Sequence, residues 1–447
     1  MSSIDYISRL PDCLISHILS FVSTKEAAST SVLAKRWRYL FALTPDLYFD
    51  DSVYLNPENK SKTLMSFVDF VDRVLVLHQN VPLNRFSLKC EDVIHPAIIT
   101  SWLLKVMNRG VLDLDLQIIS SDMDCPLPSE MFVSETLVKL FIRVCGVLAI
   151  DKAKDVFLPK VKTLRFDHVI VKNSFFRKLL LGCQALKTLV LNNFFEKVSF
   201  DTPNLVLLEY SDTIADKYPK VEFSSLVEAR LDLRMTKDRL VKAKFSDDDR
   251  SLPVEMVASA TNFFMGICNV KVLHLSSDTL EVLTYCGKPI PEFYNLVHLT
   301  IQTDLEVSWG TLHAILKNCP KLETLVFEGL HYGDINHTPW EDTSAWLSSS
   351  PVKKLKVLKF EAVSCDIDDM DRQIYIIKHF VETMPNLEEV VLYYVTRGDD
   401  DDPRIVSTAF QMFEKLASTK CKIRVVSDKI TLSSTIVCST SATTGLL

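Results

Sequence analysis

Apolar residues recur along most of this chain in one phrase, L-x-x-L-x-L, which returns about every two dozen residues. Its last positions alternate between apolar and polar, which is typical of a strand with one buried face. A helical apolar pattern precedes several copies, as in Ser174–Leu191 and Gly310–Phe327, which align without a gap. A phrase repeated at a near-fixed period indicates one small unit copied many times, because no copy can bury its apolar face alone. We therefore expect a stack of helix-then-strand units.

Twelve copies share this register, and they begin at Leu83, Val111, Leu137, Val161, Leu186, Leu205, Leu226, Val270, Leu296, Leu322, Leu355 and Leu387. Most intervals lie near the roughly 20–29 residues of leucine-rich repeats. The sequence therefore predicts an α/β fold, a curved leucine-rich-repeat solenoid with a parallel sheet. The interval from Leu226 to Val270 is much longer than the others, so it holds either an insertion or a repeat whose strand has drifted.

Residues 8–44 do not follow this phrase and predict three short helices. Pro11 suits the start of the first helix, since proline lacks the N–H that a first turn leaves unpaired. Ser23 and Glu26 form an S-x-x-E capping box that opens the second helix, and Trp37 lies in the third. So short a segment cannot bury its apolar residues alone. It is therefore either a helical cap for the solenoid or a docking module covered by a partner.

Composition excludes several classes of protein. The net charge of −7 gives no electrostatic reason to expect a nucleic-acid partner. Glycine is scarce, with 10 residues, and the glycine-rich phosphate-binding motifs are absent. We find neither G-x-S-x-G nor H-E-x-x-H, so we expect no catalytic residues and no enzyme activity.

The 11 cysteines are scattered and form no C-x-x-C pair, which favours buried, reduced thiols over a disulfide scaffold or a metal site. We therefore expect no metal and no cofactor. No apolar run reaches the roughly 18 residues of a membrane helix. We accordingly expect no membrane association and a location in the cytoplasm, the nucleus or both.

The segment LPDCLISHILSFVSTKEAASTSVLAKRWRYLF, from Leu10 to Phe41, closely resembles the F-box of plant F-box/leucine-rich-repeat proteins. Ala34 and Phe41 depart mildly from the pattern, which usually has serine and tryptophan there. Residues 351–427 resemble the FBD region found in that family, although they read equally well as final repeats. Together these resemblances cover nearly the whole chain.

The resemblance implies a substrate-receptor subunit of an SCF-type ubiquitin ligase, without catalytic residues of its own. The F-box would bind a Skp-type adaptor, and through it cullin, while the repeats present a protein substrate. By position, the adaptor-binding residues would be Leu10, Pro11, Leu14, Ile18, Leu19, Val32, Leu33 and Trp37, although some of them must instead hold the helices together. A non-ligase interaction scaffold and a ligand sensor are the alternative functions.

Five segments follow from these patterns. We expect an F-box over 8–44, a linker and helical junction over 45–79, and leucine-rich repeats over 80–350. An FBD-like region or final repeats would fill 351–427, and a Ser/Thr-rich tail, expected to be disordered, would fill 428–447. The prolines and acids between Pro45 and Lys62 suggest that the linker is a hinge.

Residues between the leucines of the phrase should point away from the core, because side chains alternate along a strand. The candidate substrate face therefore contains Arg165, Asp167, Asn192, Glu209, Arg230, His274, His298 and Gln302. This row carries both signs of charge and few aromatic residues. It is therefore also consistent with an ordinary solvated sheet face.

Overall fold

The computed structural model describes residues 9–53, 60–79, 81–91, 94–118, 127–147, 155–194, 199–215, 218, 221–245, 254–285, 290–304, 309–330, 347–360, 367–394, 421–427 and 431–432. The chain divides into two compact units, Met1–Ser225 and Leu226–Leu447. In the described part of the chain, no helix has the length and apolar character that crossing a membrane requires.

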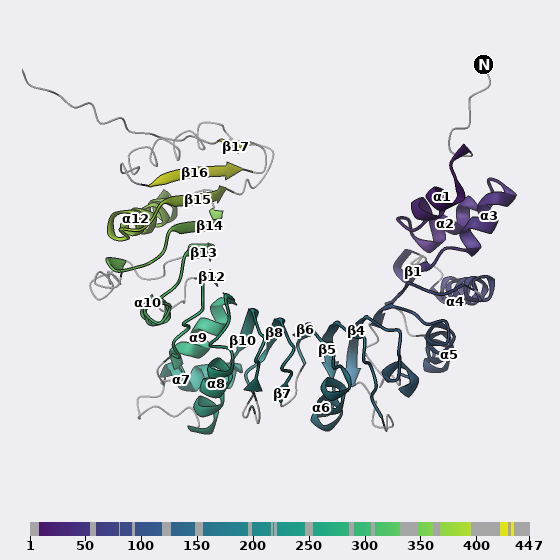
Figure 1. The fold of residues 1–447 in the computed structure, drawn as a ribbon, viewed down its shortest axis with the longest axis horizontal. Coiled ribbons are helices and arrows are strands. Elements are labelled where there is room, and N and C mark those ends of the chain that lie inside the picture. The colour runs from purple at the N-terminus through teal and green to yellow at the C-terminus, as the bar shows by residue number, and fades with distance from the viewer. Residues whose placement is uncertain are drawn as a thin grey trace, which may run out of the picture. The chain divides into compact units, whose positions relative to one another are not determined.

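The first unit begins with a three-helix module, here residues 9–44, formed by α1 (Asp12–Leu19), α2 (Thr24–Thr30) and α3 (Lys35–Ala42) (Figure 1). The expected capping box is present, since Ser23 Oγ accepts from the Glu26 amide at 3.2 Å and the Ser23 amide donates to Glu26 Oε2 at 3.0 Å. The core of the module contains Ile15, Leu19, Ala27, Trp37, Leu40 and Phe41.

The module is followed directly by the first strand of the sheet, β1 (Asp46–Asp50), which pairs in parallel with β2. The sheet therefore starts at Asp46, well before the expected repeat start at residue 80. Part of the expected linker over 45–79 is a repeat, completed by η2 (Asp51–Val53) and α4 (Lys60–Leu77). The sequence hides this repeat because buried Thr44 stands where the phrase has leucine. Residues 54–59 lie outside the described residues.

Two contacts join the module to this first repeat. The Tyr48 amide of β1 donates to Thr24 Oγ1 of α2 at 2.6 Å, so a helix residue of the module satisfies a donor of the edge strand. The ring of buried His78, just after α4, has Nε2 at 2.7 Å from the Phe41 carbonyl oxygen and Nδ1 at 2.9 Å from that of Val74. The module therefore caps the end of the sheet.

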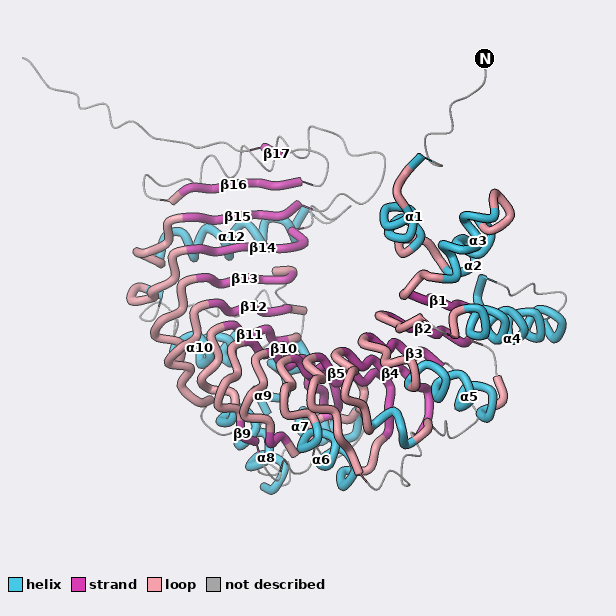
Figure 2. Tube along the Cα trace, turned by 45° about the vertical axis from the view of Figure 1, so that its right-hand side comes forward, coloured by secondary structure: helices cyan, strands magenta, loops and turns pink. Residues whose placement is uncertain are grey.

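In the rest of the first unit, each copy of the L-x-x-L-x-L phrase forms one strand of the sheet, and the helices lie on one side of it (Figures 1 and 2). The strands in spatial order are β1, β2 (Arg85–Cys90), β3 (Asp113–Ile118), β4 (Lys139–Val147), β5 (Thr163–Ile170), β6 (Thr188–Asn192) and β8 (Leu207–Thr213), all parallel. The helical elements are α5 (Pro96–Met107), η3 (Ser129–Phe132) and α6 (Asn173–Gly182), and β7 (Phe200–Asp201) pairs separately with β9 (Val221–Glu222).

The second unit continues the plan. Its parallel strands in spatial order are β10 (Glu228–Arg234), β11 (Val272–Leu275), β12 (His298–Gln302), β13 (Thr324–Glu328), β14 (Lys354–Phe360), β15 (Glu389–Tyr394) and β16 (Lys422–Ser427). Its helices are α7 (Lys237–Phe245), α8 (Val254–Gly266), α9 (Ser277–Tyr285), α10 (Trp309–Lys317) and α12 (Ile367–Thr383).

The strand register confirms the phrase as the repeating unit. Leu164, Leu189 and Leu208 are paired neighbours on β5, β6 and β8, and Leu299 pairs with Leu325 on β12 and β13. All five side chains are fully buried. The alternation therefore predicts the core face correctly, because every repeat places the same position inside.

The long interval after Leu226 is an insertion. β10 pairs directly with β11, and α7 and α8 lie between them in the chain. The buried side chains of Phe263 and Phe264 show that α8 packs against the core.

The C-terminal part also follows the repeat plan. β14, β15 and β16 continue the parallel sheet, and Leu355 pairs with Val390, which pairs with Ile423. The short strand β17 (Thr431–Leu432) pairs antiparallel with β16 and lies within the segment expected to be a disordered tail. The rest of the tail lies outside the described residues.

Candidate partner-binding surfaces

The three-helix module leaves large apolar side chains in solvent. Val32 is 84% exposed and Leu33 is 68% exposed in the turn between α2 and α3, while Leu14 and Ile18 are 48% and 44% exposed one helical turn apart on α1. Phe21, just after α1, is 75% exposed. We call these five residues the exposed apolar set. Five large apolar side chains so exposed within one short module mark it as a candidate partner-binding surface.

Burial divides the eight residues expected to bind the adaptor. Leu19 and Trp37 are 2% and 8% exposed, so they hold the helices together and are not available to a partner in this structure. Pro11 is exposed and Leu10 is half-buried. The guanidinium of Arg36 fixes this entry segment, because it donates to the Leu10 carbonyl oxygen and to Asp12 Oδ1.

Phe21 was not among the expected residues. It lies beyond the end of α1, where the helical spacing used to choose the others no longer applies. The bulky aromatic side chain directly after Ile18-Leu19-Ser20 was the signal in the sequence that could have identified this residue.

The four candidate substrate-face residues of the first unit lie on neighbouring strands. Arg165 and Asp167 are on β5, Asn192 on β6 and Glu209 on β8, and Asp167 pairs with Asn192 in the sheet register. The structure therefore brings these residues together on one sheet face, as the alternation predicts.

Asp167 is nevertheless buried, unlike the exposed Arg165 on the same strand. Its Oδ1 lies 2.7 Å from His168 Nδ1, and its Oδ2 lies 3.7 Å from Arg143 Nε. Strand alternation would not place His168 beside Asp167, because neighbouring strand residues normally point to opposite faces.

The four candidates of the second unit also share adjacent strands, with Arg230 on β10, His274 on β11, and His298 and Gln302 on β12. Glu228 organises this group, since its Oε1 lies 2.7 Å from Arg230 Nε and 3.5 Å from His274 Nε2. Burial, together with the charge of Arg230, lowers the pKa of His274 to about 4. Burial also lowers the pKa of His298.

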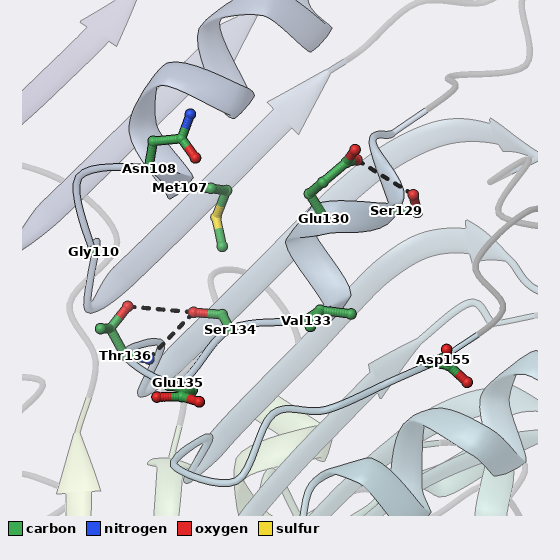
Figure 3. A pocket seen from close by; sticks show the side chains of 10 residues that line it. All are labelled: Met107, Asn108, Gly110, Ser129, Glu130, Val133, Ser134, Glu135, Thr136 and Asp155. Atoms are coloured by element: carbon green, nitrogen blue, oxygen red, sulfur yellow. Dashed lines mark hydrogen bonds between the residues drawn. The ribbon is translucent and has the colours of Figure 1, made fainter.

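A hollow of about 670 Å³ lies at the amino-terminal edge of β4 (Figure 3). Its wall is built from the end of α5, η3 and the loops beside them, and it includes Glu130, Glu135 and Asp155. Glu130 already accepts a hydrogen bond from Ser129 at 3.3 Å.

Two further observations concern chemistry. Within the described residues, no three His, Cys, Asp or Glu side chains are grouped so as to hold a metal ion. The described cysteines Cys13, Cys90, Cys183, Cys268, Cys319 and Cys421 are free thiols. Burial raises the pKa of Cys183 and Cys319 to about 12, so these two thiols are protonated and unreactive.

Comparisons with known proteins agree with this architecture. The family model "F-box domain" matches residues 7–45, and the model "FBD-associated F-box protein At5g56370, LRR repeats" matches residues 99–241. The F-box/LRR-repeat protein At4g14096 of Arabidopsis thaliana is 46% identical over 99% of this chain and 98% of the relative. This chain belongs to the F-box/LRR-repeat family.

Other relatives are similar over nearly the same share of the chain. The Arabidopsis F-box/LRR-repeat protein At3g59200 is 46% identical over 97% of this chain and 90% of its own length. The putative F-box/FBD/LRR-repeat protein At3g59240 of the same plant is 42% identical over 95% of this chain and 90% of its own length. The family resemblance, including its FBD component, is therefore confirmed. In this F-box/LRR-repeat protein, β14, β15 and β16 continue the repeat sheet through the segment that the sequence predicts to be FBD-like or final repeats.

Proposed function

We propose that this F-box/LRR-repeat protein is a substrate-receptor subunit of an SCF-type ubiquitin ligase. Its F-box binds a Skp-type adaptor, and through it cullin. The exposed apolar set carries this proposal, because removing apolar surface from water is favourable by roughly 25 cal/mol per Å². These side chains remain in solvent unless a partner covers them.

The adaptor contacts are made by Leu14, Ile18, Val32 and Leu33, with Leu10 and Pro11 at their edge. Leu19 and Trp37 act indirectly, since they hold the helices that present the others. The bound interface is mostly apolar, so high salt weakens it little, because screening acts on exposed charges.

The repeats recruit a protein substrate through the exposed face of the sheet. The protein acts as a non-catalytic subunit without a cofactor, in the cytoplasm or the nucleus. The candidate contacts are Arg165, Asp167, Asn192 and Glu209 in the first unit and Arg230, His274, His298 and Gln302 in the second. Asp167 contributes by orienting its neighbours, since its carboxylate is buried.

Capture by a purified Skp-type adaptor tests the first step. Leu33→Glu places a charge where an apolar anchor should be buried, and we expect it to abolish capture, since truncating a central anchor alone often costs about 2 kcal/mol or more. The matched control is Leu181→Glu on α6, which replaces a similarly exposed leucine in the repeats and should leave capture intact. Circular dichroism would establish that both variants remain folded.

Capture that survives Leu33→Glu would show that the exposed apolar set does not form the interface. Failure of the wild type to bind the adaptor would instead favour the non-ligase scaffold or the ligand sensor.

A further inference from the structure

Arg165 is held on the exposed sheet face by an aromatic ring. Its Cζ lies 4.9 Å from the centroid of Phe141, its register partner on β4. A guanidinium over a ring face is stabilised by cation–π attraction and keeps its in-plane N–H donors available. The ring therefore fixes the arginine in place, and the arginine's side-chain N–H donors make no hydrogen bond with the residues that the structure describes.

The carboxylate on the same strand as Arg165 belongs to Asp167, and it contacts other side chains. Asp167 lies two residues after Arg165 and so projects from the same side of β5. Its carboxylate contacts His168 at 2.7 Å and Arg143 at 3.7 Å.

An unusual backbone produces this arrangement. His168 has a φ of 55°, a backbone angle that residues other than glycine rarely adopt. This turn of the backbone places the imidazole of His168 beside the carboxylate of Asp167. In the next repeat Asn193 has a φ of 49°, and its Nδ2 lies 3.2 Å from His168 Nε2. Such conformations persist where the surroundings enforce them, and they often mark functional sites.

Other arginines of the sheet face are paired with acids. Arg85 Nη2 lies 3.4 Å from Asp115, and Arg230 Nε lies 2.7 Å from Glu228, two positions away on its own strand. For Arg165, no carboxylate lies within 4 Å among the residues that the structure describes.

We propose that Arg165, stacked on Phe141, anchors a side-chain carboxylate of an acidic peptide segment in the recruited protein. This inference rests on the proposed function of the repeats. Lys139 and Arg143 flank Phe141 on the same side of β4, and each lies near a carboxylate, Asp113 at 3.9 Å and Asp167 at 3.7 Å. Arg165 is the cation beside them that lacks such a partner among the described residues, which supports a carboxylate from the recruited protein. Arginine suits this role because its planar fork matches the two oxygens of a carboxylate.

A phage-displayed random peptide library selected on the full chain is the probe. We expect wild-type protein to enrich peptides rich in aspartate and glutamate. A selected peptide should lose about tenfold or more in affinity when its critical Glu is changed to Gln, or when the protein carries Arg165→Gln. Phe141→Leu should weaken binding several-fold, because the arginine loses its platform.

Arg85→Gln is the control, since it removes a sheet-face arginine that is already paired with Asp115 and is not among the candidate substrate contacts. It should leave peptide affinity unchanged. Enrichment without acidic preference, or full binding by Arg165→Gln, would overturn the inference. Binding only by peptides with phosphoserine in place of Glu would overturn the choice of a carboxylate.

Adaptor capture, measured on the same preparations, separates this inference from the proposed function. Intact capture together with loss of acidic preference rejects only the anchor at Arg165. A wild type that fails to bind the adaptor rejects the proposed ligase role, whatever peptides it selects.

Discussion

His274 shows how one half-buried side chain on the sheet face makes stability depend on pH. Its imidazole lies on β11, where His274 pairs in register with Arg230 of β10 and Thr300 of β12, and the ring centroid of His298 is 6.1 Å away. Its pKa is lowered to about 4, first by burial and then by Arg230. Glu228 opposes this shift but does not overcome it. The folded protein therefore keeps His274 neutral under conditions where a free imidazole is charged.

We expect His274→Gln to reduce the acid sensitivity of folding. The unfolded chain binds a proton at His274 near pH 6.5 and the folded chain only near pH 4. Between these values the unfolded state holds more protons, so stability is present above pH 6.5 and is lost as pH falls toward 4. Denaturant unfolding at a series of pH values should show a shallower loss in the variant. Because His78, His298 and His379 also have a lowered pKa, the difference from wild type is the informative quantity, and parallel curves would contradict this role.

At the scale of elements, hydrogen bonds hold the F-box against the first repeat at the place where the sequence suggested a flexible hinge. Helix α2 supplies Thr24 Oγ1 to the Tyr48 amide of edge strand β1, and His78 links the ends of α3 and α4 through two carbonyl oxygens. Edge strands normally leave such amides unpaired or shielded. The F-box therefore protects the first edge of the sheet.

Thr24→Val tests this contact between the F-box and the first repeat, because valine and threonine side chains have nearly the same shape. It removes the acceptor for the Tyr48 amide, and an unsatisfied buried donor costs roughly 1–3 kcal/mol. Hydrogen exchange should become faster at Tyr48. Thr30→Val on the same helix is the control, because Thr30 Oγ1 only donates to the Ala27 carbonyl oxygen. Equal exchange rates at the Tyr48 amide in wild type and Thr24→Val would mean that the hydrogen bond to Thr24 does not protect this amide.

At the scale of the whole molecule, each repeat is buried mainly by its neighbours. Leu189 of β6 packs in register with Leu164 and Leu208, and Leu325 of β13 occupies the same position in the second unit. In such arrays stability is close to a sum of repeat and nearest-neighbour terms. A defect should therefore remain near the repeat in which it arises.

Leu189→Ala and Leu325→Ala should each cost roughly 2–5 kcal/mol through loss of buried contacts. We expect Leu189→Ala to speed hydrogen exchange in β5, β6 and β8 while leaving β13 and β14 at wild-type rates, and Leu325→Ala to do the reverse in β12, β13 and β14. Uniform acceleration along both units would indicate that the chain unfolds as one cooperative body.

The sequence by itself determined the repeating architecture and the F-box. Strand alternation is local, so Leu189 and Leu325 could be assigned to the core from spacing alone. Contacts between repeats are not local. The first strand escaped notice because Thr44 replaces a leucine, and only packing shows that Leu19 and Trp37 face inward while Val32 and Leu33 do not.

Tertiary structure also decided the chemistry of the sheet face. Asp167 and Arg165 are both predicted to face away from the core, yet Asp167 is buried beside His168, whose backbone is left-handed. The register with β4 places Arg165 on Phe141. Alternation fixes the face from which a side chain emerges. Its neighbour across the sheet depends on the register between strands and on backbone strain, which only the folded chain sets.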